Sequence, residues 1–316
     1  MFSVWARGSV WTQTMVRTAM RWSSSSAPPP PPPTSPPTPT TSIDSIPQTA
    51  AGDASRDPVS AGGGASPGGA VPERKRFYRS VTVSAAPATA PAPGFVIKLD
   101  DRQLRTPARS LLVLPTKALA VGVAGEWDSQ RPTIKPHLMP LTALSNTATD
   151  PHRQRDRNQR VEDLLRFLAT DTVCCRTPDP AAFQEMQSTH WDPLVHWFTK
   201  RFGVELNVSE DLFGGVHPEA TTDRMRDVLK NMNEWTFTGL ETATLTAKSM
   251  VIAAALGGGY IDANQATICA HLEEEFQTER WGKVEWGHGM RHADTRMTLA
   301  AAGLFMRLAT ENARLL

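Results

Sequence analysis

The stretch GFVIKLDDRQLR, residues 94–105, carries the alternating pattern of a β-hairpin. Phe95, Ile97 and Leu99 fall on one side of an extended chain, because successive side chains of a strand point to opposite faces. The Asp100-Asp101 pair that comes next predicts a tight turn, after which the chain runs back through residues 103–105. This stretch therefore predicts a fold that begins with antiparallel strands.

Two neighbouring segments extend this β region. Arg79–Ser84 places two valines on one side of a short strand, and Leu111–Leu114 reads as a third apolar strand. From Thr116 the period changes from two to 3.6, since Leu119, Val123 and Trp127 recur on one face of a helix that Thr116 can cap. Residues 74–140 are thus expected to form a small, mostly antiparallel β domain.

The rest of the chain shows helical patterns, which predict an α-helical domain over residues 141–316. Helices are expected over residues 161–168, 222–232, 234–256, 263–281 and 290–309, and two more within 181–203, broken at Asp192-Pro193. Gly257–Gly259 is expected to separate two of them. Strands first and helices after favour the α+β class over a parallel α/β sheet.

Residues 1–73 have a different composition. The first 26 residues carry three arginines and many serines, and no acidic residue precedes Asp44, which is typical of a mitochondrial transit peptide. A proline tract and a glycine-rich linker come next, and such segments do not form a packed core. The folded part is expected to begin near Arg74.

Composition excludes several classes of function. A formal net charge of +1 gives no basic face for nucleic acid, and no run of 18 apolar residues is present to insert into a membrane. The three cysteines, Cys174, Cys175 and Cys269, form neither a disulfide framework nor a redox pair, so we expect packing residues in a reducing compartment. Nothing demands an oligomer, and a monomer is expected.

Catalytic motifs are missing from the sequence. It contains neither a nucleophile elbow nor a phosphate-binding loop. Glu285 and His288 form one Glu-x-x-His pair, followed by His292, but a helical di-metal site needs two such pairs. We therefore expect no catalytic residue, no cofactor and no metal ligand, and keep a metal-dependent enzyme around Glu285 and His288 only as a minor alternative.

The segment LEEEFQTERWG, residues 272–282, suggests a binding surface instead. On a helical wheel, Cys269, Leu272 and Phe276 form a core stripe, while Glu274 shares a second face with Gln277 and Trp281. A carboxylate beside an amide and a large aromatic ring fits an interface, where tryptophan is enriched. The same pattern fits an internal tie within the helical domain, so both interpretations of Glu274 stay open.

Seven segments together resemble one known family in order and spacing: GFVIKLDDRQLRTP (94–107), EWDSQ (126–130), IKPHLMPLTALSNTATD (134–150), RFLATDTVCCR (166–176), WDPLVHW (191–197), KSMVIAAAL (248–256) and LEEEFQTERWG. Residues 76–311 are similar to the mitochondrial F1-ATPase assembly factor 2 family. This resemblance implies a matrix chaperone without catalytic activity. It also implies that the protein binds unassembled F1 alpha subunit until beta subunits replace it. An adaptor with another client is the alternative.

The resemblance also implies which residues meet the partner. The family's helix signature corresponds here to Glu273, Glu274, Phe276, Gln277 and Trp281, followed by Gly282. Two departures are visible: Asp100-Asp101 stands where the family usually has Asp-Gly, and Gly289 stands where relatives often have an acidic residue. Aspartate tolerates left-handed backbone geometry, so a similar turn is expected at the first position.

Overall fold

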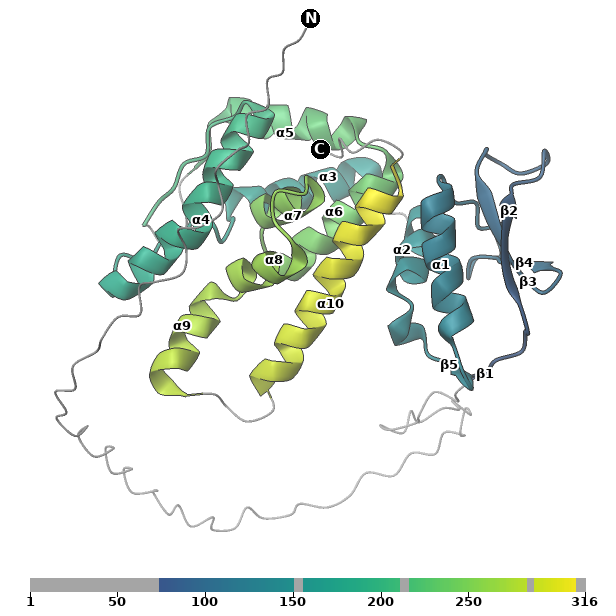
Figure 1. The fold of residues 1–316 in the computed structure, drawn as a ribbon. Coiled ribbons are helices and arrows are strands. Elements are labelled where there is room, and N and C mark those ends of the chain that lie inside the picture. The colour runs from purple at the N-terminus through teal and green to yellow at the C-terminus, as the bar shows by residue number, and fades with distance from the viewer. Residues whose placement is uncertain (1–73, 151–155, 211–215, 283–286, 311–316) are drawn as a thin grey trace, which may run out of the picture. The chain divides into compact units, whose positions relative to one another are not determined.

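The structure, a computed structural model, describes residues 74–150, 156–210, 216–282 and 287–310 (Figure 1). Within these ranges five short strands lie near the N-terminal end, and the helices α1–α10 make up most of the remaining residues. This order confirms the α+β class. The expected transit peptide and linker, residues 1–73, lie outside the described residues.

The strands form two small antiparallel sheets. β2 (Val81–Ala85), β3 (Phe95–Leu99) and β4 (Arg102–Gln103) make one sheet in that order, and β1 (Arg74–Lys75) pairs with β5 (Thr133–Ile134) in the other. Leu99 pairs with Arg102 across the turn. Asp100 has a φ of 53°, the left-handed conformation that the turn requires, so the expected hairpin is confirmed.

The prediction of a third strand over Leu111–Leu114 is wrong. Leu114 exchanges two backbone hydrogen bonds with Phe95, and Leu111 forms a single bridge with Arg105, but the segment forms no continuous ladder. The apolar pattern arises because Leu112 and Leu114 are fully buried in the core under the sheet. A short apolar run does not distinguish a strand from another buried segment, since burial alone produces such a run.

Two helices pack against the strands. α1 (Lys117–Ser129) begins at Thr116, whose side chain accepts a hydrogen bond from the Leu119 N–H, as expected. α2 (Pro140–Thr149) comes after a single 3-10 turn, Pro136–Leu138. Both helices bury leucines in the same cluster as β3, which gives the β region its core.

The EWDSQ segment at the end of α1 holds the next helix in place. Both oxygens of Glu126 reach the start of α2, accepting from the backbone N–H of Leu141 and Thr142 at 2.7 Å each. Gln130 accepts from the Lys135 N–H at 2.7 Å. Burial raises the pKa of Glu126 above its ordinary value, although these hydrogen bonds to the carboxylate partly offset the rise. This segment is therefore structural.

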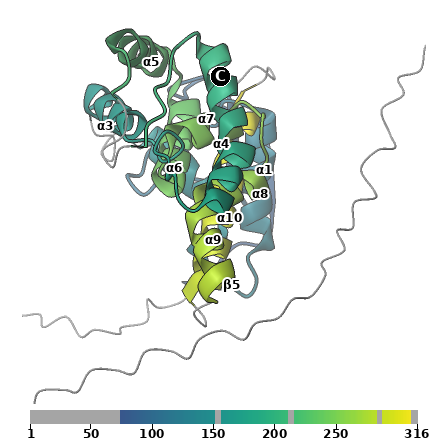
Figure 2. The same ribbon diagram turned by 90° about the vertical axis from the view of Figure 1, so that its left-hand side faces the viewer.

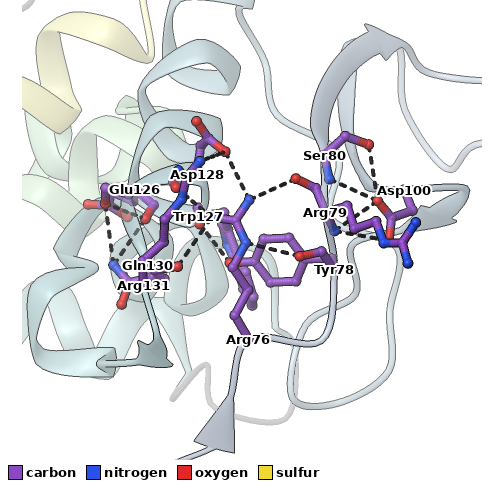
Figure 3. A network of polar contacts seen from close by, with 11 residues as sticks. Arg76, Tyr78, Arg79, Ser80, Asp100, Glu126, Trp127, Asp128, Gln130 and Arg131 are labelled. Carbon is purple, nitrogen blue, oxygen red and sulfur yellow. Dashed lines mark hydrogen bonds and ion pairs between the residues drawn. The ribbon is translucent and has the colours of Figure 1, made fainter.

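Arg76 ties the first strands to the same end of α1 (Figure 3). Its guanidinium donates to the backbone oxygens of Tyr78, Asp128 and Gln130, and it also pairs with the Asp128 carboxylate at 3.0 Å. The Tyr78 hydroxyl donates to the Trp127 carbonyl at 2.6 Å. One largely buried cation thus satisfies several backbone oxygens left over at the end of a helix.

The helical part contains α3–α10. Their bounds are α3 (Arg157–Ala169), α4 (Ala181–Phe202), α5 (Glu219–Asn231), α6 (Glu234–Ala247), α7 (Met250–Gly257), α8 (Ala263–Ala270), α9 (Leu272–Trp281) and α10 (Gly287–Leu308). The predicted helices near 161–168, 222–232 and 290–309 are confirmed, with ends that shift by one to four residues. Among the described residues we find no helix whose length and hydrophobicity suit a membrane span.

The predicted break of the fourth helix at Pro193 is wrong. α4 continues through Pro193, which faces solvent, while Trp191 and Leu194 on either side are buried. Proline removes one hydrogen bond, but water can satisfy the freed carbonyl on an exposed face. Packing of the buried face on both sides of Pro193 outweighs that local cost.

The single helix predicted over 234–256 is also wrong. Lys248 adopts a left-handed conformation with a φ of 57° and ends α6. Ser249 then caps α7, accepting from the Ile252 N–H at 3.0 Å. Ser249 was the local signal that a new helix starts here. Serine is unfavourable inside a helix, because its side chain bonds to nearby backbone groups, and it is favoured at N-caps.

α7 lies at the centre of the helical part, enclosed by α3, α4, α6, α8 and α10 in both views (Figures 1 and 2). Every residue of α7 is buried. Asp171, also fully buried, accepts hydrogen bonds from the N–H groups of Val173 and Val251. A carboxylate from the loop after α3 therefore satisfies the N-terminus of a helix that water does not reach.

α10 connects the two hydrophobic clusters of the protein. Leu299, Ala302 and Met306 of α10 pack in the helical cluster, whereas Phe305 of α10 and Ala309, just after it, pack with the β region. The hydroxyl of Thr116, at the start of α1, donates to the Leu308 carbonyl. The domain boundary expected at residue 140 stays a prediction.

Close approach of α6 and α10 requires a glycine. A Cβ at Gly239 would lie 2.4 Å from Cγ of Met306, so Gly239→Ala should destabilise the protein by about 1–3 kcal/mol through overpacking. Gly125→Ala is the matched control, because Gly125 lies in a helix with no atom within 4 Å of the added methyl group. Urea unfolding should show the control to be unchanged or more stable by up to about 1 kcal/mol. Equal stability of both variants would contradict the close packing.

The buried carboxyl of Asp171 predicts a pH-dependent stability. Burial raises its pKa to about 6 in the folded protein, so the folded state holds a proton that the unfolded chain releases near pH 4. This contribution is complete below pH 4 and is lost as the pH rises through about 6. Compared with Asp171→Asn, the wild type should lose on the order of 2 kcal/mol between pH 4 and pH 8.

Urea unfolding across this pH range measures the difference. Asp227→Asn serves as the control, because it makes the same substitution at an exposed position on α5. A constant difference for Asp171→Asn would show that Asp171 does not titrate on folding.

Candidate functional site

α8 and α9 carry the residues that the sequence selected. Asp262 and Gln265 start α8 with a reciprocal capping box, at 2.8 Å and 3.1 Å. The single helix predicted over 263–281 is wrong, because His271 leaves helical geometry and separates α8 from α9. The predicted core stripe nonetheless survives this break, since Cys269, Leu272 and Phe276 are all buried.

The sequence-selected residues divide by exposure. Phe276 is buried and stacks on Phe183, with ring centroids 4.9 Å apart. Trp281, at the last position of α9, is 75% exposed. Gln277 and Glu273 are both exposed, and the Gln277 amide donates to the Glu273 carboxylate at 3.0 Å. Phe276 thus supports the helix from inside, while the other three present polar and aromatic groups to solvent.

Glu274 lies between two histidines. Its Oε2 is 2.9 Å from Nδ1 of His271, and its Oε1 is 3.8 Å from Nε2 of His292 on α10. The Glu274 side chain is only 19% exposed, and the exposed Arg291 guanidinium approaches it to 4.0 Å. Of the two interpretations of Glu274, this placement favours an internal tie between α9 and α10.

His271 was missed as a functional candidate, and His292 was considered only beside the Glu285–His288 pair. Their rings stack with centroids 4.2 Å apart and planes inclined by 29°. His271 lies three residues before Glu274, and that spacing on a helix was the one available signal. The metal site considered around Glu285 and His288 lies outside the described residues, which include neither Glu285 nor the His288 side chain.

A hollow of ≈ 380 Å³ opens beside this cluster. Its walls come from α8, the middle of α9 and the beginning of α10, including Thr267, Ile268, Glu275, His292, Ala293 and Arg296. Ile268 is 43% exposed, and Met290 at the start of α10 is 74% exposed. Figure 1 shows the C-terminal end of α9 and the N-terminal end of α10 at the same end of the helical part. This end of the helical part therefore exposes apolar side chains around a concave, partly charged surface.

Burial protects two of the three cysteines. Cys174 and Cys269 are buried, and burial raises the pKa of the Cys269 thiol to about 11. Desolvation raises the pKa of Cys174 as well. A thiol held neutral in this way is a poor nucleophile, so both residues are packing residues, as expected.

The chain is similar to several known proteins. Residues 75–199 match the family model described as ATP12 chaperone protein. The mitochondrial protein atp12 of Schizosaccharomyces pombe is 28% identical over 248 residues, which cover 75% of this chain and 83% of that protein. The chain belongs to the ATP12 chaperone family. This membership confirms the family expected from the seven sequence segments, and the protein is a chaperone of ATP synthase assembly.

Solved structures extend the ATP12 likeness through the helical part. The crystal structure of Atp12 from Paracoccus denitrificans matches with a TM-score of 0.69 at 27% identity, covering 75% of this chain and 99% of that chain. The Atu1473 protein of Agrobacterium tumefaciens matches with a TM-score of 0.65 at 33% identity, covering 73% of this chain and 84% of that chain. These relatives share the α+β arrangement described above.

The different exposure of Phe276 and Trp281 can be measured. Phe276→Ala removes a buried ring that stacks on Phe183 and should lower the free energy of unfolding by about 3 kcal/mol. Trp281→Ala changes a side chain that is 75% exposed and should shift it by no more than about 0.5 kcal/mol. Thermal and urea unfolding of both variants compare them directly. A large loss for Trp281→Ala would mean that Trp281 packs against the protein itself.

Proposed function

We propose that the protein binds unassembled F1 alpha subunit in the mitochondrial matrix and holds it until it enters the F1 complex. It does so as a monomer, by covering apolar surface of the client, without a catalytic step. The exposed Trp281 at the end of α9 is the single observation that carries this proposal. Large exposed apolar side chains rimmed by polar residues mark sites of protein interaction.

The contact face is built around that tryptophan. Trp281 is the apolar anchor, Met290 lies near the N-terminal end of α10, and Gln277 and Glu273 supply exposed hydrogen-bonding groups. Tryptophan anchors of this kind contribute much of the binding energy at protein interfaces. Glu274 and Phe276 act as positioning residues, because one ties α9 toward α10 and the other fixes α9 to α4.

A subunit awaiting assembly exposes the surfaces that its neighbours later cover, and such surfaces promote aggregation. Reversible binding by a chaperone prevents this without chemistry. The matrix location is supported by relatives that are named mitochondrial proteins and by the basic, acid-free start of the sequence. Family membership supports a chaperone role over the metal-dependent enzyme considered from the sequence.

Affinity capture from a mitochondrial matrix extract tests the proposal. The wild type should enrich F1 alpha subunit over beta subunit. Trp281→Ala should weaken capture of alpha subunit at least about tenfold, since truncation of an aromatic hot spot commonly costs about 2 kcal/mol or more. The free energy of unfolding is measured in parallel to show that the variant remains folded.

Phe77→Ala is the matched control for this experiment. Phe77 is 58% exposed but lies beside β1, away from α9, so its removal should leave capture unchanged. Equal capture by Trp281→Ala and wild type would reject the contact face. Enrichment of a different protein without alpha subunit would favour the alternative of an adaptor with another client.

A further inference from the structure

We propose that His271, Glu274 and His292 form a binding site for a divalent metal ion of the zinc class. The three side chains come from the α8–α9 junction, the first turn of α9 and the first half of α10. One ligand atom from each lies within 4.8 Å of the others. The inference goes beyond chaperone function, and it contradicts the expectation from the sequence that the chain holds no metal.

The distances to the Glu274 carboxylate suit a small ion. Ligands held at about 2.0–2.1 Å by a tetrahedral ion lie roughly 3.3 Å apart. Nδ1 of His271 lies 2.9 Å from one Glu274 oxygen, and Nε2 of His292 lies 3.8 Å from the other. These two distances end on different oxygens of Glu274, and one ligand atom from each of the three side chains lies within 4.8 Å of the others. Binding of one ion would require side-chain rotations that turn the stacked imidazole rings toward a common point and bring the ligand atoms to this spacing.

The second nitrogen of each imidazole ring is also held. Nε2 of His271 lies 3.0 Å from the Thr295 hydroxyl on α10, and Nδ1 of His292 lies 3.2 Å from a Glu275 carboxylate oxygen. Histidines that bind metal usually make such a contact through the nitrogen that does not face the ion, because it fixes the tautomer and the ring orientation. Here both rings direct their remaining nitrogen toward Glu274.

Burial and access also agree with a metal site. The side chains of His271, Glu274 and His292 are 12%, 19% and 25% exposed, so water competes little with them. His292 lines the ≈ 380 Å³ hollow, which gives an ion a path from solvent. Arg291 lies 4.0 Å from Glu274, but its side chain is 68% exposed and can turn outward into solvent.

The donor set indicates which ion would bind. Two imidazole nitrogens and one carboxylate match zinc sites that keep an open fourth position, whereas magnesium and calcium prefer oxygen ligands. Such an ion would join the α8–α9 junction to α10 and set the spacing of the two helix ends that carry Trp281 and Met290. The bound ion would thus stiffen the proposed contact face.

The test uses the full-length protein, freed of metal with a chelator. Titration with Zn²⁺ followed by calorimetry should show one ion per chain with a dissociation constant below about 1 μM. Co²⁺ should give the intense visible absorption of a four-coordinate site. Saturating Zn²⁺ should raise the melting temperature, because a ligand of the native state stabilises it.

His271→Ala and His292→Ala should each weaken Zn²⁺ binding at least about tenfold and abolish the Co²⁺ absorption. His196→Ala, which removes an exposed histidine on α4, should leave both readouts unchanged. If His271→Ala fails to fold, His292→Ala decides the question, because His292 is the more exposed of the two.

Binding no tighter than about 100 μM, or binding that survives both substitutions, would overturn the proposal and leave a hydrogen-bonded cluster without metal. The titration contains no client protein. Its failure would therefore leave the capture experiment untouched, and failure of client capture would likewise leave the metal site standing.

Discussion

Complete burial of one short apolar helix is the constraint on which the rest of the helical part depends. α7 has no exposed residue, so the free N–H groups at its start cannot bond to water. Asp171 and Ser249 supply acceptors instead. An unsatisfied buried N–H costs about 1–3 kcal/mol, a large share of the roughly 5–15 kcal/mol that stabilises a typical domain. A central helix is possible here because a carboxylate is buried with it.

The same need to satisfy buried polar groups joins the β region to the helices. Glu126 holds the start of α2, and Arg76 satisfies carbonyls at the end of α1. α10 then reaches from the β-side cluster, through Phe305, to the α8–α9 junction, through His292. Because an α-helix is stiff over this length, packing around its C-terminal half determines where His292 meets Glu274.

Local patterns predicted the elements well where one interaction dominates. The alternation of apolar side chains and an aspartate that adopts left-handed backbone geometry produced the hairpin, and Thr116 marked the start of α1. Prediction failed where tertiary packing opposed a local rule. α4 passes through Pro193 because its buried face continues on both sides, and Leu112 and Leu114 are apolar through burial without belonging to a strand.

The amino-acid sequence by itself determined the α+β order, the core stripe of α9 and membership of the ATP12 family, because periodicity and motif spacing are local properties of the chain. Only the tertiary structure decided that Phe276 faces Phe183, that Trp281 faces solvent, and that His271, Glu274 and His292 meet. The last contact joins residues about twenty positions apart on different helices. Packing of the helices against a distant core brings these residues together, and their spacing in the sequence does not predict it.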